Sequence, residues 1–562
     1  MTEASQEILA ARPWIPRYQP GVPAEIEPQF QSTLVEIWRR SRALYASRPA
    51  LDSFGARLTY AELGEAADRV TAWLQAQGFA KGDRAAIMLP NVAAYPAIFL
   101  GILQAGGVVV NVNPLYTPRE LEGQLLDATP RFLFVLENFA ATVAAIASHV
   151  SLERTILVAP GDLIGIKGRI VNFISRYVKK AVPPAVVPGA VSFAEAMKST
   201  AGRALQPVEL SGEDLAVLQY TGGTTGKAKG AMLLHRNIAA NVEQCLLWFR
   251  PQVPEGTPMM MITALPLYHI FALTTCFWFE MRIGGCCLLV ANPRDIDGFV
   301  KILRKNKFHI FAGVNTLYNV LADHPGIKEV DFSSVAFFIA GGMAMQQAVA
   351  RKWRQLTGKA IIEGYGLSET SPVLCANRAD LEEFSGTVGY PVPSTDISIR
   401  DLEGNPVPVG EAGEICAKGP QVMPGYWDRP MATEAAMTKD GYFRTGDAGV
   451  LQADGQVKIV DLLKDMIIVS GFKVYPNEIE DVLVEHPLVR EAAVIGRPNM
   501  ATGEEVVAFV VPRDERLTVQ DLRDFCRERL TGYKMPREFV FRGELPKSNV
   551  GKVLRKDLKD LL

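Results

Sequence analysis

The ten residues from Tyr220 to Lys229 combine small, hydroxylated and basic side chains in a pattern that suits phosphate binding. Their order is Tyr-Thr-Gly-Gly-Thr-Thr-Gly-Lys-Ala-Lys, with almost no apolar side chain to pack in a core. Glycines let the backbone approach a ligand, hydroxyls and main-chain N–H groups donate hydrogen bonds, and lysines supply positive charge. We therefore expect a phosphate site formed by Thr221, Gly222, Gly223, Thr224, Thr225, Gly226 and Lys227.

The flanks of this loop suggest how it is held. Residues 215–220 have the pattern of a short strand and residues 237–247 that of a helix. A strand, a glycine-rich loop and a helix in this order would let the helix N-terminus help hold an anion. An ordinary P-loop NTPase is disfavoured, because only three residues separate Gly222 from Gly226 and because Ala228 stands where that motif needs Ser or Thr.

The run Tyr-Thr-Gly-Gly-Thr-Thr-Gly-x-x-Lys-Gly-Ala-x-Leu resembles the signature of the adenylate-forming enzymes. This superfamily includes acyl-CoA synthetases, luciferases and the adenylation domains of peptide synthetases. The resemblance implies that the substrate is a carboxylate activated by ATP. Several further segments match the family in order, from about residue 34 to residue 562.

The second matching segment, Ile361–Thr370, supplies most of the implied nucleotide site. By resemblance Tyr365 stacks on the adenine, Ser368 contacts the α-phosphate, and Glu369 binds Mg²⁺ with Thr221 as a second protein ligand. A hard cation that bridges phosphates prefers carboxylate and hydroxyl oxygens, which agrees with this assignment. Asp447, in a third segment, matches the aspartate that binds both ribose hydroxyls. We expect further nucleotide contacts from Gly341, Gly342, Glu363, Gly364, Lys464 and Gly471.

Three segments point to an acyl substrate. His269 lies in Leu-Pro-Leu-Tyr-His-Ile-Phe; a lone histidine among aromatics is usually a core residue, but this block resembles the acyl-pocket motif, where the histidine borders the carboxylate. Residues 311–318 resemble the wall of the acyl tunnel, in which Gly313 would leave room for a chain. The block from residue 440 to residue 461 resembles the signature of fatty acyl-CoA synthetases, which implies a long-chain fatty acid.

Length and composition set the domain organisation. A chain of 562 residues exceeds what one core usually supports, so at least two domains are expected. Strands alternate with helices, which predicts α/β wound sheets in a large N-terminal domain. We expect this domain over residues 1–460, a hinge at 461–464 and a small, mobile α+β domain over 465–562, together the adenylate-forming fold.

The expected hinge and the last motif are the segments that domain movement would involve. The family has Asp-Arg-x-Lys-Asp at the hinge, whereas Leu462 stands at the arginine position here and Lys464 matches the lysine. We expect altered domain closure or weaker ATP binding, with the chemistry retained. Near the end of the chain, Lys552 matches the family's catalytic lysine, on a loop that begins at Pro546.

Charge and cysteine content narrow the compartment and the partners. A formal net charge of −2 gives no nucleic-acid signature, and seven cysteines without a CxxC pair suit a reducing cytosol. The N-terminus carries Glu3 and Glu7 and lacks the pattern of a signal peptide, so we expect a cytoplasmic protein. Residues 258–279 have no Asp, Glu, Lys or Arg, but Pro266 and His269 interrupt them, which favours buried core and a pocket-lining helix over a membrane span.

Residues 163–182 form the most unusual surface candidate. Apolar residues recur at helical spacing, and all charges between them are basic. Such a helix suits an anionic membrane surface, which would make the protein peripheral on the inner face of the membrane. Alternatively, the apolar stripe packs on the body and the lysines are merely solvated. Both interpretations stay open, as do the preferred chain length and the oligomeric state, for which a homodimer is one candidate.

These observations predict a long-chain fatty-acid–CoA ligase. The acid would react with ATP to give acyl-AMP and pyrophosphate, and CoA would then give acyl-CoA and AMP, with Lys552, Glu369 and His269 as catalytic residues. Between the steps the small domain would rotate and bring the Ser470-Gly471-Phe472 turn beside a pantetheine channel. The alternatives are an acyl-AMP ligase that feeds a separate carrier protein and a non-enzymatic peripheral lipid-binding protein.

Overall fold

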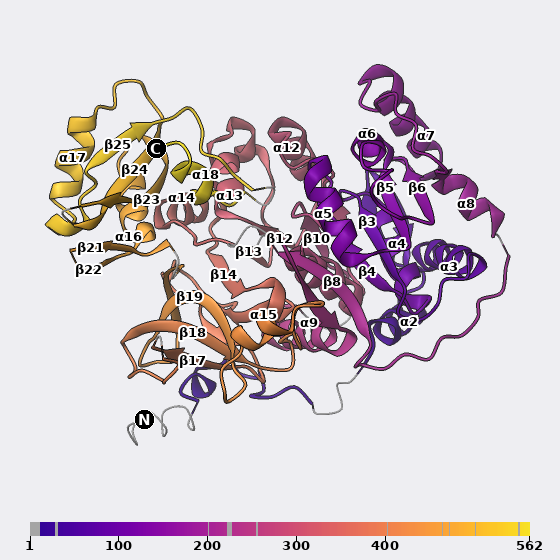
Figure 1. Ribbon diagram of the computed structural model, residues 1–562, viewed down its shortest axis with the longest axis horizontal. Coiled ribbons are helices and arrows are strands. Elements are labelled where there is room, and N and C mark those ends of the chain that lie inside the picture. The colour runs from indigo at the N-terminus through magenta and orange to yellow at the C-terminus, as the bar shows by residue number, and fades with distance from the viewer. Residues whose placement is uncertain are drawn as a thin grey trace.

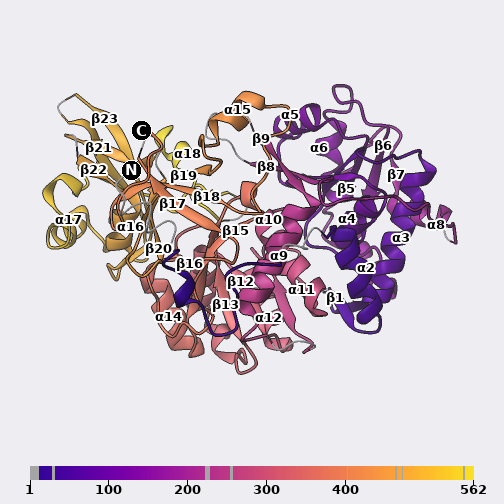
Figure 2. The same ribbon diagram turned by 90° about the horizontal axis from the view of Figure 1, so that it is seen from below.

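The computed structural model describes residues 12–562 except 28–31, 201, 222–227, 254–256, 402, 463–464, 471, 501 and 549–550. Within the described residues the strands form four sheets (Figure 1). The two larger sheets are mostly parallel, as the alternation of strands and helices predicts, and the C-terminal sheet lies at the opposite end of the molecule from α7 and α8 (Figures 1 and 2). This is the predicted adenylate-forming architecture.

The first large sheet carries the strand that leads into the glycine-rich loop. Its order is β7 (Val191–Ser192), β6 (Arg154–Val158), β5 (Phe132–Leu136), β3 (Arg84–Met88), β4 (Val108–Asn111), β8 (Leu215–Thr221) and β9 (Lys229–Leu234). All neighbours pair in parallel except β8 and β9, which are antiparallel.

The glycine-rich loop therefore joins two antiparallel strands. The predicted passage from this loop into a helix is wrong, because β9 intervenes and α9 (His235–Phe249) begins only after it. The physical reason is long-range pairing: Thr221 lies opposite Lys229 and Leu218 opposite Met232, so the segment 229–234 extends the sheet. The N-terminus of α9 cannot directly follow the loop and cap a phosphate there.

The second large sheet supplies the edge on which the site is built. Its order is β16 (Tyr390–Pro391), β15 (Val373–Ala376), β14 (Ile361–Gly366), β13 (Phe337–Ala340), β12 (Ile310–Gly313), β10 (Met260–Thr263), β11 (Cys286–Leu289), β1 (Pro49–Ser53) and β2 (Ala56–Thr59). The strands β10, β12, β13 and β14 run parallel, so their carboxyl ends meet at one edge.

Local sequence signals explain where two of the N-terminal helices begin. The side chains of Thr33 and Thr59 cap α2 (Leu34–Leu44) and α3 (Tyr60–Ala76), each with a glutamate at the third helical position completing a capping box. The other helices of this part are α4 (Ala94–Gln104), α5 (Pro118–Ala128), α6 (Ala140–Ala144), α7 (Gly165–Phe173), α8 (Phe193–Ser199), α10 (Ile270–Ala272), α11 (Phe279–Ile283), α12 (Ile296–Lys305), α13 (Asn315–Asp323), α14 (Gln347–Thr357) and α15 (Pro430–Ala435).

The apolar segment 258–279 is buried, as expected. It contains β10 and a helical stretch in which α10 passes through a π-helical turn, Leu273–Trp278, into α11. No helix among the described residues is long and apolar enough to span a bilayer.

A third sheet and the C-terminal part complete the chain. The third sheet is antiparallel, in the order β17 (Asp396–Arg400), β18 (Ala412–Lys418), β19 (Phe443–Leu451) and β20 (Val457–Leu462). The C-terminal sheet contains β21 (Ile467–Val469), β22 (Phe472–Val474), β23 (Val489–Asn499), β24 (Gly503–Pro512) and β25 (Glu538–Phe541), with α16 (Pro476–Val484), α17 (Val519–Arg527) and α18 (Arg555–Lys559) beside it.

Candidate active site

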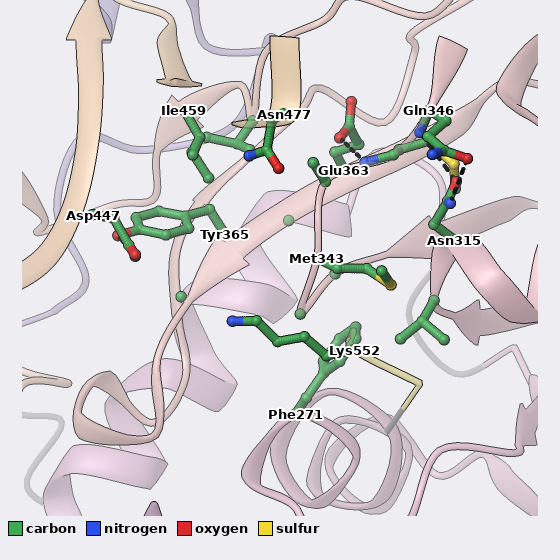
Figure 3. A pocket seen from close by; sticks show the side chains of 18 of the residues that line it. Phe271, Asn315, Met343, Gln346, Glu363, Tyr365, Asp447, Ile459, Asn477 and Lys552 are labelled. Carbon is green, nitrogen blue, oxygen red and sulfur yellow. Dashed lines mark hydrogen bonds between the residues drawn. The ribbon is translucent and has the colours of Figure 1, made fainter. Parts of the chain in front are cut away.

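One cavity of about 1360 Å³ brings together side chains from both parts of the chain. Figure 3 shows Tyr365, Glu363 and Asp447 on one side and Lys552 reaching in from the C-terminal part. The cavity lies at the carboxyl ends of the parallel strands β10, β13 and β14, where loops leave the sheet and backbone groups become available. The predicted residues that line it are Thr221, His269, Gly341, Gly342, Glu363, Gly364, Tyr365, Ser368, Glu369, Asp447 and Lys552.

The glycines after β13 are needed for close approach. A Cβ on Gly341 would lie 3.0 Å from Cζ of Phe271 and 3.1 Å from the carbonyl oxygen of Gly364. The next residue, Gly342, has a φ of +77°, a conformation that other residues rarely adopt, and open space lies where its Cβ would be. The strand end therefore offers bare backbone to the cavity, as the Gly-Gly pair predicts.

Tyr365 and Asp447 form one buried unit. The Tyr365 hydroxyl donates a hydrogen bond of 2.7 Å to Oδ2 of Asp447, and both residues are more than nine-tenths buried. Burial and the neighbouring Asp447 carboxylate raise the pKa of Tyr365 well above its ordinary value, so the phenol stays protonated. The Tyr365 ring is thus held in place by burial and by the hydrogen bond from its hydroxyl to the Asp447 carboxylate.

Glu369 is held by the segment that follows β18. Its Oε1 accepts a hydrogen bond of 2.8 Å from the Tyr426 hydroxyl, and its carbonyl oxygen accepts one of 2.8 Å from the Met423 N–H. Burial raises the pKa of Glu369, an effect opposed by the Tyr426 hydrogen bond and by the charge of Lys229. The short helical turn that carries Glu369, Ser368–Thr370, packs against β8 and β9.

A divalent cation fits these groups only together with phosphate oxygens. Among the described residues no cluster of three or more His, Cys, Asp or Glu could hold a metal ion. Glu369 and the Thr221 hydroxyl, which line the same cavity, are oxygen ligands of the kind that Mg²⁺ prefers, and Mg²⁺ commonly binds one or two carboxylates plus substrate phosphates.

Glu363 lies in the wall between β13 and β14. Its Oε2 accepts a hydrogen bond of 3.2 Å from the Met345 N–H, and no described residue bonds to its Oε1. Burial raises the pKa of Glu363 to about 8, so the side chain is largely protonated at neutral pH. It can then act as donor or as acceptor toward a ligand.

His269 is fixed in one tautomer. Its Nδ1 accepts the Phe271 N–H at 3.3 Å, at the start of α10, so the proton of the neutral ring is on Nε2. Burial, with a smaller contribution from Lys552, lowers the pKa of His269 to about 4 and keeps the ring neutral. The ring can therefore donate one hydrogen bond to a substrate oxygen in the cavity.

Lys552 reaches the cavity from a tight hairpin. The Ser548 N–H donates to the Lys552 carbonyl at 2.7 Å, and the Lys552 N–H donates to Oγ of Ser548 at 3.1 Å. Beside it, Gly551 has a φ of +83°, and a Cβ there would lie 2.5 Å from Oγ1 of Thr316. Figure 3 shows the Lys552 side chain extending between Phe271 and Met343 in that view.

The hairpin is continued by a residue that ties it to α16. Arg555 donates a hydrogen bond of 2.8 Å from Nη2 to Oε1 of Glu480 and forms a 3.3 Å ion pair with Asp465. Asp465 follows the expected hinge directly, so the end of the chain is connected to the segment about which the small domain would turn.

Some predicted site residues lie outside the described residues. These are Gly222, Gly223, Thr224, Thr225, Gly226, Lys227, Lys464 and Gly471. Leu462 closes β20 opposite Asp447, and its side chain is likewise outside the description. The assignments made for these residues stay predictions.

One expected feature of the acyl tunnel is wrong. Gly313 does not leave room for a chain, because its space is filled by Tyr318: a Cβ on Gly313 would lie 2.9 Å from Cε2 of that ring. The Tyr318 ring is fully buried, and its hydroxyl donates to the carbonyl oxygens of Phe311 and Ile339, each at 2.9 Å. The glycine serves internal packing, and the cavity wall begins at the next residue, Val314.

Sequence reasoning missed several wall residues. Lys229 and Tyr426 line the cavity beside Glu369. Asn315 and Gln346 line it near the Lys552 hairpin, where Nδ2 of Asn315 donates a hydrogen bond of 3.0 Å to Oε1 of Gln346. The motif offered one signal, since its Gly-x-x-Lys-Gly spacing falls on Lys229 and not on Lys227. No local sequence signal indicates that Tyr426 contacts Glu369, because the two residues lie 57 positions apart in the chain.

The site and fold define an ATP-using adenylate-forming enzyme, and comparison with known proteins agrees. The chain belongs to the AMP-binding enzyme family, which matches residues 38–427, and the AMP-binding enzyme C-terminal domain matches residues 478–552.

Relatives narrow the class further. The chain is 48% identical to a long-chain-fatty-acid–CoA ligase of Salmonella typhimurium over 551 residues, covering 97% of this chain and 98% of the relative. Among solved structures, ATP-bound MatB from Rhodopseudomonas palustris aligns with a TM-score of 0.81 at 30% identity, over 94% of this chain and 98% of that chain. The apo form of that protein aligns with a TM-score of 0.72 at 29% identity over the same shares.

Proposed function

We propose that this chain joins long-chain fatty acids to CoA in two steps at the cavity described above. In the first, a carboxylate oxygen of the acid attacks the α-phosphorus of ATP, giving acyl-AMP and releasing pyrophosphate. In the second, the CoA thiolate attacks the acyl carbonyl carbon, giving the thioester and releasing AMP. The observation that carries this proposal is the meeting of Tyr365, Asp447, Glu369 and Lys552 in one cavity.

Each wall residue has a role in the first step. Tyr365 and Gly341 bind the adenine, Asp447 binds the ribose hydroxyls, and Ser368 contacts the α-phosphate. Mg²⁺, held by Glu369 and Thr221 together with phosphate oxygens, would offset phosphate charge. The Nε2–H of His269 donates to an oxygen of the substrate carboxylate, and the Lys552 ammonium stabilises the charge that develops as the α-phosphate is attacked.

The second step requires Lys552 to leave. Lys552 lines the cavity in the present structure, so movement of residues 465–562 about a hinge at 461–464 would withdraw it and separate the two steps. The higher TM-score against ATP-bound MatB than against its apo form supports an arrangement suited to ATP in the present structure. These domain bounds remain part of the proposal.

Omission experiments test the reaction. Palmitate, ATP and CoA are supplied together and then with each left out, and pyrophosphate and palmitoyl-CoA are measured. The proposed ligase needs all three for continuous release. Full pyrophosphate release without CoA and no thioester with it would indicate an acyl-AMP ligase, and no acid-dependent release at all would indicate a lipid-binding protein.

We also propose that the enzyme works in the cytoplasm at the inner face of the membrane, docked through residues 163–182. In the structure most of this segment is α7 and a π-helical continuation, Ile174–Val178. Ile164, before α7, is buried in the core, but most of the apolar side chains of the helical part are exposed. Ile166, Phe173 and Tyr177 are 77%, 58% and 66% exposed. The expectation of a stripe packed on the body is therefore wrong.

Charge and anchoring support an anionic bilayer as the partner. Arg169, Lys179 and Lys180 have no ion-pair partner among the described residues, whereas Arg176 is held by Glu137 at 2.7 Å and fixes the segment to β5's end. A rigid helix that presents apolar and basic side chains to solvent suits insertion at the headgroup level. Its position at the end of the molecule opposite the C-terminal sheet leaves it accessible (Figure 1).

Liposome co-sedimentation tests this docking. Charge reversal of Lys179 and Lys180, or replacement of Phe173 and Tyr177 by Ser, should each reduce binding to vesicles with anionic lipid. Charge reversal of the exposed Lys305 and Lys307 is the control and should leave binding unchanged. Equal binding by all three variants would contradict the proposal. A homodimer remains a further prediction, which sedimentation of the same samples would measure.

A further inference from the structure

Tyr426 lies on a segment that adds to the edge of the sheet carrying the glycine-rich loop. It pairs with Ala231 of β9 as an isolated antiparallel bridge. The Trp427 N–H donates to the Gly230 carbonyl at 2.8 Å, which fixes the register of the segment. The backbone therefore places Tyr426 beside β9, and its side chain lines the cavity.

The Tyr426 side chain touches two groups of opposite charge. Its hydroxyl donates to Oε1 of Glu369 at 2.8 Å. The ammonium of Lys229 lies over the face of its ring, 5.1 Å from the centroid. One aromatic side chain thus contacts both the carboxylate assigned to Mg²⁺ and a lysine that lines the same cavity.

The chemistry of the two contacts differs in an informative way. A phenol orients a carboxylate without supplying a counter-charge, so the carboxylate keeps its charge for a cation. A ring face attracts an ammonium without consuming an anionic ligand. Among the described residues no ion pair within 4.0 Å joins Lys229 to Glu369, although the lysine is close enough to lower the pKa of that glutamate.

We propose that Tyr426 is a positioning residue that keeps Lys229 and Glu369 apart, so that one remains available to phosphate and the other to Mg²⁺. Without the ring face that holds the ammonium and the hydroxyl that holds the carboxylate, the two groups would be free to pair and neutralise each other. This inference depends on the proposed binding of Mg²⁺ and ATP at this cavity. It adds a residue from outside the glycine-rich and Gly-Tyr-Gly motifs to the machinery of the first step.

A purely structural role for Tyr426 makes a different prediction. If the side chain only anchors its segment to β9, its loss would lower stability and disturb all ligands alike. A separating role predicts a selective loss of divalent-cation affinity, and it predicts that removing the lysine restores part of that affinity. The two roles are therefore distinguishable by direct binding measurements.

The first test removes only the hydroxyl. Mg²⁺ is titrated calorimetrically into enzyme saturated with ATP, and metal-free ATP binding and thermal unfolding are measured on the same samples. Tyr426→Phe should weaken Mg²⁺ binding about tenfold, as loss of a partner that orients a metal ligand commonly does. Metal-free ATP binding and the unfolding temperature should stay close to wild type.

The second test removes the ring. Tyr426→Leu should weaken Mg²⁺ binding further, because Lys229 can then pair with Glu369. Adding Lys229→Gln to Tyr426→Leu should recover several-fold in Mg²⁺ affinity while weakening ATP binding. Tyr442→Phe is the matched control, since Arg400 lies over that ring at 4.5 Å but Tyr442 does not line the cavity.

The outcomes separate the two levels of the proposal. If wild-type enzyme with ATP shows no Mg²⁺ binding, the metal assignment itself fails. If wild type binds Mg²⁺ but Tyr426→Phe binds it equally well, only the orienting role of Tyr426 is overturned. If Lys229→Gln gives no recovery in the Tyr426→Leu background, the separating role is overturned.

Discussion

Tyr365, Glu369 and Asp447 are buried, and hydrogen bonds join Tyr365 to Asp447 and Glu369 to Tyr426, whereas Lys552 is an exposed residue on a half-buried hairpin. In the proposed reaction the first set of groups would serve the nucleotide in both steps and stay in place. The lysine would serve only the first step and leave for the second. The groups that the proposed reaction needs in both steps are thus buried and hydrogen-bonded, whereas the group that it needs in one step is exposed.

The hairpin nevertheless reaches the cavity by specific contacts. Gly551 packs against Thr316 at the start of α13, and Arg513 at the end of β24 pairs with Asp323 at the end of α13 at 3.1 Å. These two contacts are small, and the ion pair is partly exposed, which suits the proposed movement of the C-terminal part. The following predictions test whether the buried groups and the hairpin differ in this way.

The largest expected effect comes from the lysine itself. Lys552→Ala should lower the rate of ATP–pyrophosphate exchange by roughly 10²- to 10³-fold, the loss typical of one group that stabilises transition-state charge. Thioester formation from supplied acyl-AMP should change by no more than a few-fold. The control is Lys556→Ala, an exposed lysine outside the cavity. Equal loss in both half-reactions would mean that Lys552 is needed in both steps, like Tyr365 and Asp447.

The second prediction concerns how the buried Glu363 makes the stability of the protein depend on pH. The pKa of Glu363 is raised by burial to about 8 from an ordinary value of 4.5, so the folded state retains a proton that the unfolded state releases. This contribution to stability is fully present below pH 4.5 and is lost as pH rises to about 8, by on the order of a few kcal/mol. Glu363→Gln removes the titrating group.

Calorimetric unfolding of the ligand-free protein measures this effect. The melting temperature of Glu363→Gln minus that of wild type should increase from pH 5 to pH 8 and then level off. The exposed Glu382→Gln should show no such slope. A difference that is constant across this range would mean that Glu363 is already ionised in the folded protein.

The sequence predicted the contiguous motif at residues 361–370 better than the contacts that depend on residues far apart in the chain. Residues 361–370 carry their glycines, tyrosine and glutamate in one contiguous run, and the alternation of strands and helices likewise predicted the two mostly parallel sheets. Contacts made at long range were not predictable. The pairing of Lys229–Leu234 with β8 and the filling of the space at Gly313 by Tyr318 depend on partners that no local pattern specifies.

The third prediction perturbs the docking of the hairpin. Gly551→Ala would place a Cβ 2.5 Å from Oγ1 of Thr316 and would strain a backbone with a φ of +83°. We expect a several-fold loss of adenylation with thioester formation retained. Thr316→Ala should restore part of the loss, since the contact is relieved while the strain remains. Gly543→Ala, where nothing lies within 4 Å, is the control.

The smallest expected effect concerns the ion pair between Arg513 and Asp323. Both side chains are more than a third exposed, and Asp323 keeps Lys352 as a second partner, so the pair contributes little on its own. Arg513→Ala should reduce adenylation relative to thioester formation by about twofold at low ionic strength, because the pair stabilises only the arrangement with Lys552 in the cavity. The difference should vanish at high salt, where exposed charges are screened. Arg516→Ala, whose 2.6 Å partner Asp514 lies in the same part of the chain, should show no such change. An effect of Arg513→Ala that persists at high salt would mean that packing, and not charge, holds the C-terminal part in place.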